Sequence, residues 1–166
     1  ALLDKAISEE NYPVSEEKIL AFYCALARQC FINEYVFAWS SEESGRAQYL
    51  RERLATALAA GSRVPVLWLV AVAAYFPLIA LPSIESLLDQ SWPDTVAALL
   101  VQQAREPLEE RQYHALIPRL TPIADNTSRL VQKQYEENPY PRWVKLPPGG
   151  RAVSIDAYLS ERFPFS

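Results

Sequence analysis

A stretch without charge constrains the fold of this chain more than any other feature. From Val64 to Pro82 the sequence contains no Asp, Glu, Lys or Arg and is almost entirely apolar. Its length approaches the roughly 20 residues that cross a bilayer, but Pro77 and Pro82 interrupt it, and proline breaks a helix. The flanking segments each have an apolar face that can cover it. We therefore expect a buried central helix over Val66 to Tyr75 and no membrane span.

Helical periodicity dominates the rest of the sequence. Apolar residues recur mostly in steps of three and four from Glu16 to about Trp39, and a second such helix closes at Gly61. Proline marks most later corners, and we expect the chain to restart at Glu106-Pro107. Strand-like alternation is nearly absent, and no clean internal repeat is found. The prediction is an all-α fold of about seven to eight short helices, in a bundle or a solenoid-like stack.

The composition indicates a soluble globular protein, with 50% apolar and 22% charged residues. The net charge of −4 argues against nucleic acid as a partner, because phosphate attracts basic surfaces. Cys24 and Cys30 share one helical pattern, where they are roughly 9 Å apart and cannot form a disulfide. We expect two buried, reduced thiols and a cytoplasmic location. Because methionine is absent and the chain begins in mid-pattern at Ala1, we also expect a fragment, without a signal peptide.

No catalytic constellation is recognisable in the sequence. The glycines, Gly45, Gly61 and the Gly149-Gly150 pair, do not have the spacing of a phosphate-binding loop. His114 is the sole histidine, and we interpret it as a partly exposed helical residue. One histidine and two cysteines are a poor ligand set for a metal. We therefore predict no catalytic, cofactor-binding or metal-binding residue in this chain.

The segment from Gln134 to Trp143 crowds aromatic rings, prolines and an arginine into the point where a helical pattern stops. Its prolines impose an extended path. The rings can anchor that path to the helices or, with the arginine, form a docking surface or ligand lid. We divide the chain into a helical domain, residues 1–138, and an extended linker with a short helix, residues 139–166. The candidate docking residues are Tyr135, Glu136, Glu137, Asn138, Tyr140, Arg142 and Trp143.

Charge placement adds one expectation for this segment. Glu136 and Glu137 lie near a helix end, where the helix dipole disfavours negative charge. Arg142 is the nearest cation that can compensate them. The other carboxylate pairs fall mostly in first helical turns, where negative charge is favourable, so we interpret them as solvated helix starts.

Several phrases of the sequence carry a resemblance to a known family. They are Gln29 to Phe37, Ala73 to Leu78, Trp92-Pro93 and Gln134 to Trp143. In this order they resemble bacterial proteins in which tetratricopeptide repeats precede a class I S-adenosylmethionine-dependent methyltransferase domain. The resemblance covers about residues 20–165 and implies the helical connector between the repeats and the catalytic domain. The catalytic glycine-rich motif would follow Phe165, so the family's cofactor-binding residues have no counterpart here.

Three functional hypotheses follow. The first is a non-catalytic connector or substrate-presenting module whose parent protein is a methyltransferase that uses S-adenosylmethionine. Its partner would be the adjacent methyltransferase domain, which Tyr135 to Trp143 would contact. The alternative is a self-contained helical protein–protein interaction module with a groove for a peptide or partner helix, favoured by a concave surface of Tyr, Trp and Arg. A stand-alone enzyme is the third hypothesis, with the least support. None of them involves nucleic acid or a membrane.

Overall fold

The computed structural model describes residues 2–8, 17–118, 125–137, 154–155 and 157. The described residues contain helices and irregular segments but no strand, which confirms the all-α prediction. The α-helices are α1 (Leu2–Ser8), α2 (Glu17–Ile32), α3 (Ser41–Ala59), α4 (Val66–Ala73), α5 (Asp94–Leu100), α6 (Glu106–Leu116) and α7 (Asn126–Glu137). Two 3₁₀ turns, η2 (Leu78–Ala80) and η3 (Ile84–Leu87), and a π-helical turn, η4 (Val101–Arg105), lie between α4 and α6.

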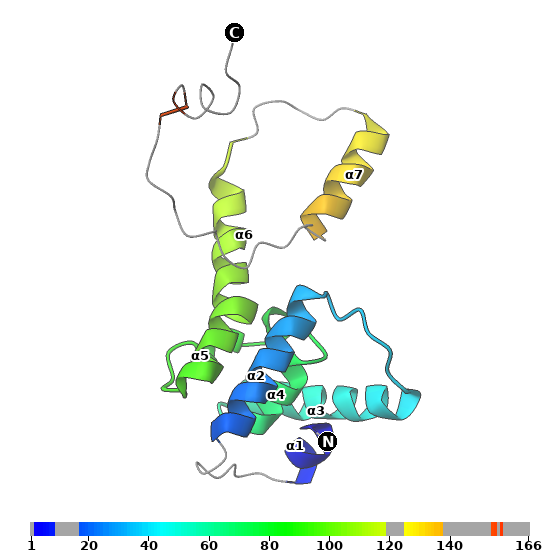
Figure 1. Cartoon of the computed structure of the whole chain (residues 1–166), viewed down its shortest axis with the longest axis vertical. Helices are drawn as coiled ribbons and strands as arrows, with labels where there is room; N and C mark the ends of the chain where they lie inside the picture. The colour runs from blue at the N-terminus through cyan, green and yellow to red at the C-terminus, as the bar shows by residue number, and fades with distance from the viewer. Residues whose placement is uncertain (1, 9–16, 119–124, 138–153, 156, 158–166) are drawn as a thin grey trace.

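The apolar segment forms the centre of the fold, as predicted. Every side chain of α4 from Leu67 to Ala73 is buried, and α1, α2 and α3 pack against it (Figure 1). The helix ends at Ala73, earlier than the expected end at Tyr75, and the N–H groups of Tyr75 and Phe76 both donate to Val72 O in the closing turn. None of the described helices is long and apolar enough to cross a membrane.

Helix α2 is shorter than its pattern predicts. Instead of continuing to Trp39, α2 ends at Ile32, and Glu34 and Tyr35 adopt left-handed backbone angles with φ of 53° and 59°. Such angles are unfavourable for side chains with a Cβ atom, and they turn the chain out of the helix. The following rings therefore leave the face of α2. The predicted stop of the next helix at Gly61 is confirmed, with φ of 61°.

A helix begins at Glu106 with Pro107 in its first turn, as predicted, but it is not separated from the helix before it. Helix α5, turn η4 and helix α6 follow one another without a gap and form one rod. The N–H of Glu106 donates to Val101 O, five residues earlier, which makes this turn wider than an α-helical turn. Pro107 follows the turn directly. Pro107 has no N–H and its ring conflicts with the carbonyl four residues back, so a π turn here lets the rod continue. Six separate α-helical rods are therefore present among the described residues, fewer than expected.

The rod leaves the core as it proceeds. Its first half is anchored, because Leu99, Leu100 and Ala104 are buried against the other helices. Beyond Ala104 no described side chain is buried, and α6 projects away from α1–α5 with α7 to its side (Figure 1). The predicted domain boundary at residue 138 follows the end of α7 directly. Near the C-terminus the Ala157 N–H donates to Ser154 Oγ over 3.2 Å, the bond expected of a helix cap.

Candidate functional site

The predicted docking residues are only partly within the described chain. Tyr135, Glu136 and Glu137 form the last turn of α7, and the Tyr135 side chain is exposed. Glu136 accepts a hydrogen bond from Gln132 Nε2 over 2.5 Å, one turn back on the same helix. The remaining four, Asn138, Tyr140, Arg142 and Trp143, lie outside the described residues, and so does the expected compensation of the glutamates by arginine.

Helix α7 presents an unpartnered apolar face. Leu130, Val131 and Tyr135 lie on one side of the helix, and the charged side chains other than Glu137 lie on the other side. They are 69%, 45% and 62% exposed, respectively. The start of the helix is capped, because Asp125 Oδ2 accepts the Ser128 N–H over 2.8 Å. This bond lowers the pKa of the Asp125 carboxyl. The helix is therefore locally well formed, while its apolar face is not covered by any other described part of the chain.

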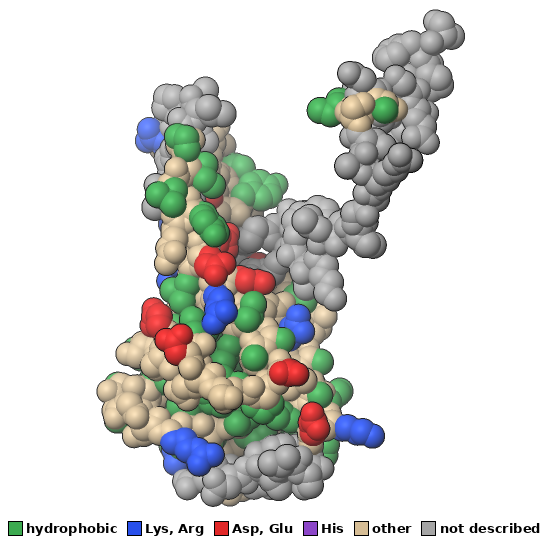
Figure 2. All heavy atoms as spheres, turned by 90° about the vertical axis from the view of Figure 1, so that its left-hand side faces the viewer, with side chains coloured by type: hydrophobic (Ala, Val, Ile, Leu, Met, Phe, Trp, Pro, Cys, Tyr) green, Lys and Arg blue, Asp and Glu red, His purple; other side chains and the backbone are tan. Residues whose placement is uncertain are grey.

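The end of α6 adds further exposed apolar side chains. Tyr113, Leu116 and Ile117 are 59%, 76% and 69% exposed. Figure 2 shows hydrophobic side chains on the upper part of the molecule, where α6 and α7 lie. Exposed apolar side chains on helices that project from a core are candidates for an interaction site. We call this set the α6–α7 surface: Tyr113, Leu116, Ile117, Leu130, Val131 and Tyr135.

A buried polar junction anchors the rod that carries the α6 part of this surface. The Gln103 side chain is fully buried in the π turn, and its Nε2 donates to Ala27 O on α2 and to Ala73 O at the end of α4, both over 3.1 Å. Its Oε1 accepts from Tyr35 Oη over 3.3 Å. Beside it, Arg28 Nε donates to Gln102 Oε1 over 3.2 Å. The junction satisfies one of the last carbonyls of α4, which a helix cannot satisfy itself.

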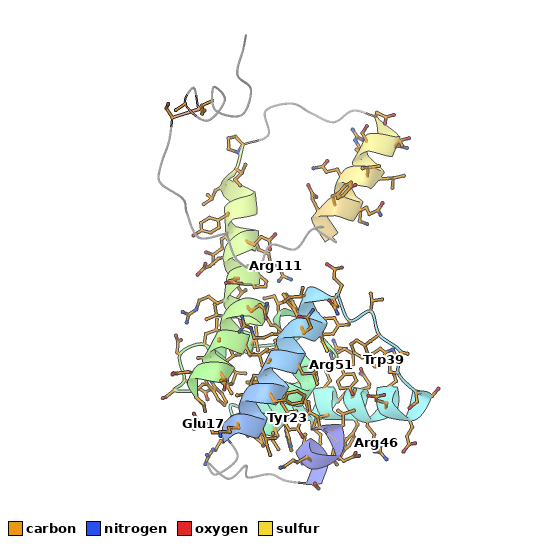
Figure 3. All side chains as sticks on the ribbon, in the orientation of Figure 1. Glu17, Tyr23, Trp39, Arg46, Arg51 and Arg111 are labelled. Carbon is orange, nitrogen blue, oxygen red and sulfur yellow. The ribbon has the colours of Figure 1, made fainter. Side chains whose placement is uncertain are left out.

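An aromatic cluster packs where the chain runs from α2 to α3. Trp39 stacks on Tyr75 with ring centroids 5.6 Å apart, and Phe37 and Phe76 complete the cluster. Tyr75 Oη donates to Glu43. The pKa of the Tyr75 hydroxyl is raised, mainly by burial and secondly by the Glu43 carboxylate. Figure 3 shows Trp39 and Arg51 on the same side of the core. The Tyr75 phenol therefore stays protonated at neutral pH and donates to the Glu43 carboxylate. This arrangement fits a structural role of Tyr75 in the cluster better than a role in proton transfer.

A polar hollow of about 310 Å³ lies beside this cluster, between α1 and α3. Arg46 occupies its rim, where it pairs with Asp4 of α1 and with Glu42, 2.6 Å away (Figure 3). The acidic groups here are thus engaged in ion pairs or hydrogen bonds. No group of His, Cys, Asp and Glu among the described residues is arranged to hold a metal ion.

A second hollow, of about 380 Å³, lies between α3 and the start of α4. Tyr49, Arg53 and Trp68 line it, and the Arg53 guanidinium carbon lies 4.1 Å from the centroid of the Trp68 ring. It lies 5.8 Å from the centroid of the Tyr49 ring. The Trp68 indole N–H is buried without a hydrogen-bond acceptor among the described residues. The sequence alone does not indicate this site, because the tyrosine and arginine come from one helix and the tryptophan from another.

The two thiols differ in burial. Cys24 is buried, as predicted, and burial raises the pKa of its thiol to about 11. Cys30 is only half-buried, so the prediction of two buried thiols is wrong for it, although desolvation also raises its pKa. Both are free, and neither has the lowered pKa of a reactive thiolate. His114 lies in α6, as expected of a helical residue.

The chain matches no protein-family model, no curated protein and no solved structure.

Proposed function

We propose that this chain is a non-catalytic helical connector that docks a catalytic domain on its α6–α7 surface. The observation that carries the proposal is the exposed apolar face of α7, formed by Leu130, Val131 and Tyr135. The sequence resemblance supports a class I methyltransferase domain as the docked partner, with S-adenosylmethionine bound by that domain. The chain would then act as a positioning or substrate-presenting part, in the cytoplasm, without contact to nucleic acid or membrane.

The division between a packed base and a projecting arm supports this proposal. The base, α1 to α5, has an apolar core, whereas the arm carries exposed apolar groups at its far end. Complete burial of one Leu, Ile or Tyr side chain contributes about 1.5–3 kcal/mol to association. A few such side chains suffice for a stable contact after the cost of association, which is why the arm is suited to docking. The predicted segment Asn138 to Trp143 would extend the same contact.

The test uses association with the separately expressed methyltransferase domain of the parent protein. Replacing Leu130 and Val131 with Ser should weaken binding at least about tenfold, because two apolar anchors are lost. Val36→Ser is the matched control, since Val36 is 81% exposed but lies on the base. Isothermal titration of each variant measures the affinity. Equal affinity of the double variant and the control would contradict the proposal, and so would a parent protein without a methyltransferase domain.

A second candidate function is a self-contained module that binds a peptide. The hollow lined by Tyr49, Arg53 and Trp68 favours it, because these residue types dominate peptide-binding hot spots. The two functions are distinguishable, since the hollow and the α6–α7 surface lie on different elements. Binding that is abolished by changes at Arg53 but unaffected by changes on α7 would indicate the second function.

A further inference from the structure

The π turn η4 changes how helix α6 is wound relative to helix α5. In an α-helix each N–H donates four residues back, and successive residues are about 100° apart around the axis. The N–H of Glu106 instead donates five residues back, to Val101 O, whereas the N–H of Ile117 donates four residues back, to Tyr113 O. The turn thus contains one residue more than an α-helical turn. Every side chain after it is therefore rotated by about 100° from its position in an uninterrupted α-helix.

This rotation determines where the apolar side of α6 faces. Leu116 and Ile117 follow Tyr113 at steps of three and four residues, so the three side chains lie on one side of the helix. All three are exposed and belong to the α6–α7 surface. Because three side chains of η4 are buried in the core, the start of the rod is fixed and the turn sets the direction of this apolar side.

Pro107 excludes the α-helical alternative to the π turn. In that alternative, residue 107 would donate to Gln103 O, four residues back. Proline has no N–H, and its ring conflicts with the carbonyl four residues earlier. No described side chain beyond Ala104 is buried, so packing against the core does not hold α6 itself in one rotation. A local device at the start of α6 is therefore needed to select the rotation.

We propose that Pro107 fixes the rotational register of α6. Because residue 107 cannot donate to Gln103 O, the five-residue bond of η4 is maintained and the side with Tyr113, Leu116 and Ile117 keeps one direction. The register does not depend on the proposed function, whereas its effect on docking rests on the α6–α7 surface.

NMR couplings through hydrogen bonds test the register, because they show which carbonyl each N–H contacts in the isotopically labelled full chain. In the native chain the Glu106 amide nitrogen should couple to the Val101 carbonyl carbon. In Pro107→Ala it should couple to the Gln102 carbonyl carbon instead, four residues back. The new N–H at position 107 should couple to the carbonyl of Gln103.

Pro93→Ala is the matched control. Pro93 precedes the first turn of α5, where an added N–H has no acceptor within the helix. We expect this variant to keep the native coupling between Glu106 and Val101. Circular dichroism of both variants checks that the helical content is unchanged.

A deletion separates the rotation from the loss of the proline. Removal of Arg105 from the Pro107→Ala variant makes Glu106 the fourth residue after Val101, so an α-helical bond joins the same two groups. Arg105 is the residue to remove because its side chain is exposed. Pro107→Ala alone should weaken docking of the separately expressed methyltransferase domain about tenfold, because it turns the apolar side away. The deletion should restore the native affinity.

The outcomes distinguish the register from the proposed function. Persistence of the coupling between Glu106 and Val101 in Pro107→Ala would overturn the proposal, because core contacts would then maintain the turn. Loss of that coupling in Pro93→Ala would also contradict it, since the effect would not be specific to position 107. Native affinity of a Pro107→Ala variant with the shifted coupling would refute the link between register and surface. A native chain that does not bind the domain would contradict the proposed function alone, and the couplings would still decide the register.

Discussion

Replacing Gln103 with Leu should destabilise the fold more than any ordinary surface change, although leucine has a similar size and suits a core. In the native structure one amide donates to Ala27 O and Ala73 O, both over 3.1 Å, and accepts from Tyr35 Oη over 3.3 Å. After the substitution Ala73 O keeps only the longer contact with Tyr35 Oη, 3.5 Å. The Tyr35 hydroxyl in turn loses the shorter of its two hydrogen bonds, the one to Gln103 Oε1.

The magnitude follows from these bonds. Each lost hydrogen bond contributes about 1 kcal/mol, and a buried polar group left without a partner costs about 1–3 kcal/mol. The added apolar surface of leucine offsets part of this loss. We therefore expect the free energy of unfolding to fall by about 3 kcal/mol, out of a total of about 5–15 kcal/mol for a domain. For a chain of this length the same loss lowers Tm by about 6–12 °C.

Urea unfolding followed by circular dichroism measures this loss. Gln48→Leu is the matched control, because Gln48 is exposed and its side chain donates to Glu52 on its own helix. It should cost less than about 0.5 kcal/mol. Tyr35→Phe should cost about 1 kcal/mol, and the double variant with Gln103→Leu should show coupling of about 0.5–1.5 kcal/mol. If Gln103→Leu is no more destabilising than Gln48→Leu, the junction does not anchor the rod.

Three further predictions concern the thiols and the backbone. Because burial raises the pKa of Cys24 from 9.0 to about 11, the folded state holds this proton more tightly than the unfolded state. The contribution of the protonated Cys24 thiol to the free energy of unfolding is complete below about pH 9 and is lost as the pH rises through 11. Urea titrations at rising pH should therefore show that Cys24→Ala loses less of its free energy of unfolding at alkaline pH than the native chain does. Iodoacetamide should label Cys30 before Cys24, as measured by mass spectrometry, and the reverse order would contradict the burial. Ser83→Gly should raise the free energy of unfolding by about 0.5 kcal/mol, because glycine adopts its φ of 55° without strain and the serine side chain makes no cap bond; a loss of stability would refute this.

The local features of the fold were predictable because each depends on neighbouring residues. The absence of charge between Val64 and Pro82 requires burial in any fold, and α4 follows from it. Ser40 and Gly61 mark the two ends of α3. Ser40 caps the start of the helix with its side chain, and Gly61 adopts the positive φ that ends it. The end of α2 was not predictable in this way. Tyr35 continues the apolar spacing of the helix, but its hydroxyl is bonded to groups distant in sequence.

The candidate sites also divide into one that depends on neighbouring residues and one that depends on residues distant in sequence. The apolar stripe of α7 is visible in the sequence, because a helix of this kind repeats its pattern locally. Arg53 and Trp68 belong to separate helices, and nothing local indicates that the indole N–H lacks an acceptor. Glu106-Pro107 predicts a helix start because proline is favoured in a first turn, whereas the π turn that joins this helix to α5 without a gap has no local sequence signal.

The position of the polar junction has a consequence for docking. Gln103 lies where the rod leaves the core, and its bonds reach α2 and α4 at once. An apolar residue there could pack in several orientations, but an amide with directional bonds fixes one. The direction in which α6 projects is therefore set by groups that do not themselves belong to the α6–α7 surface. A partner that binds the α6 part of this surface meets side chains on a rod whose direction is already fixed, so less conformational entropy is lost on association than with a flexible rod. Gln103→Leu should accordingly weaken docking as well as stability, even though it removes no contact with the partner.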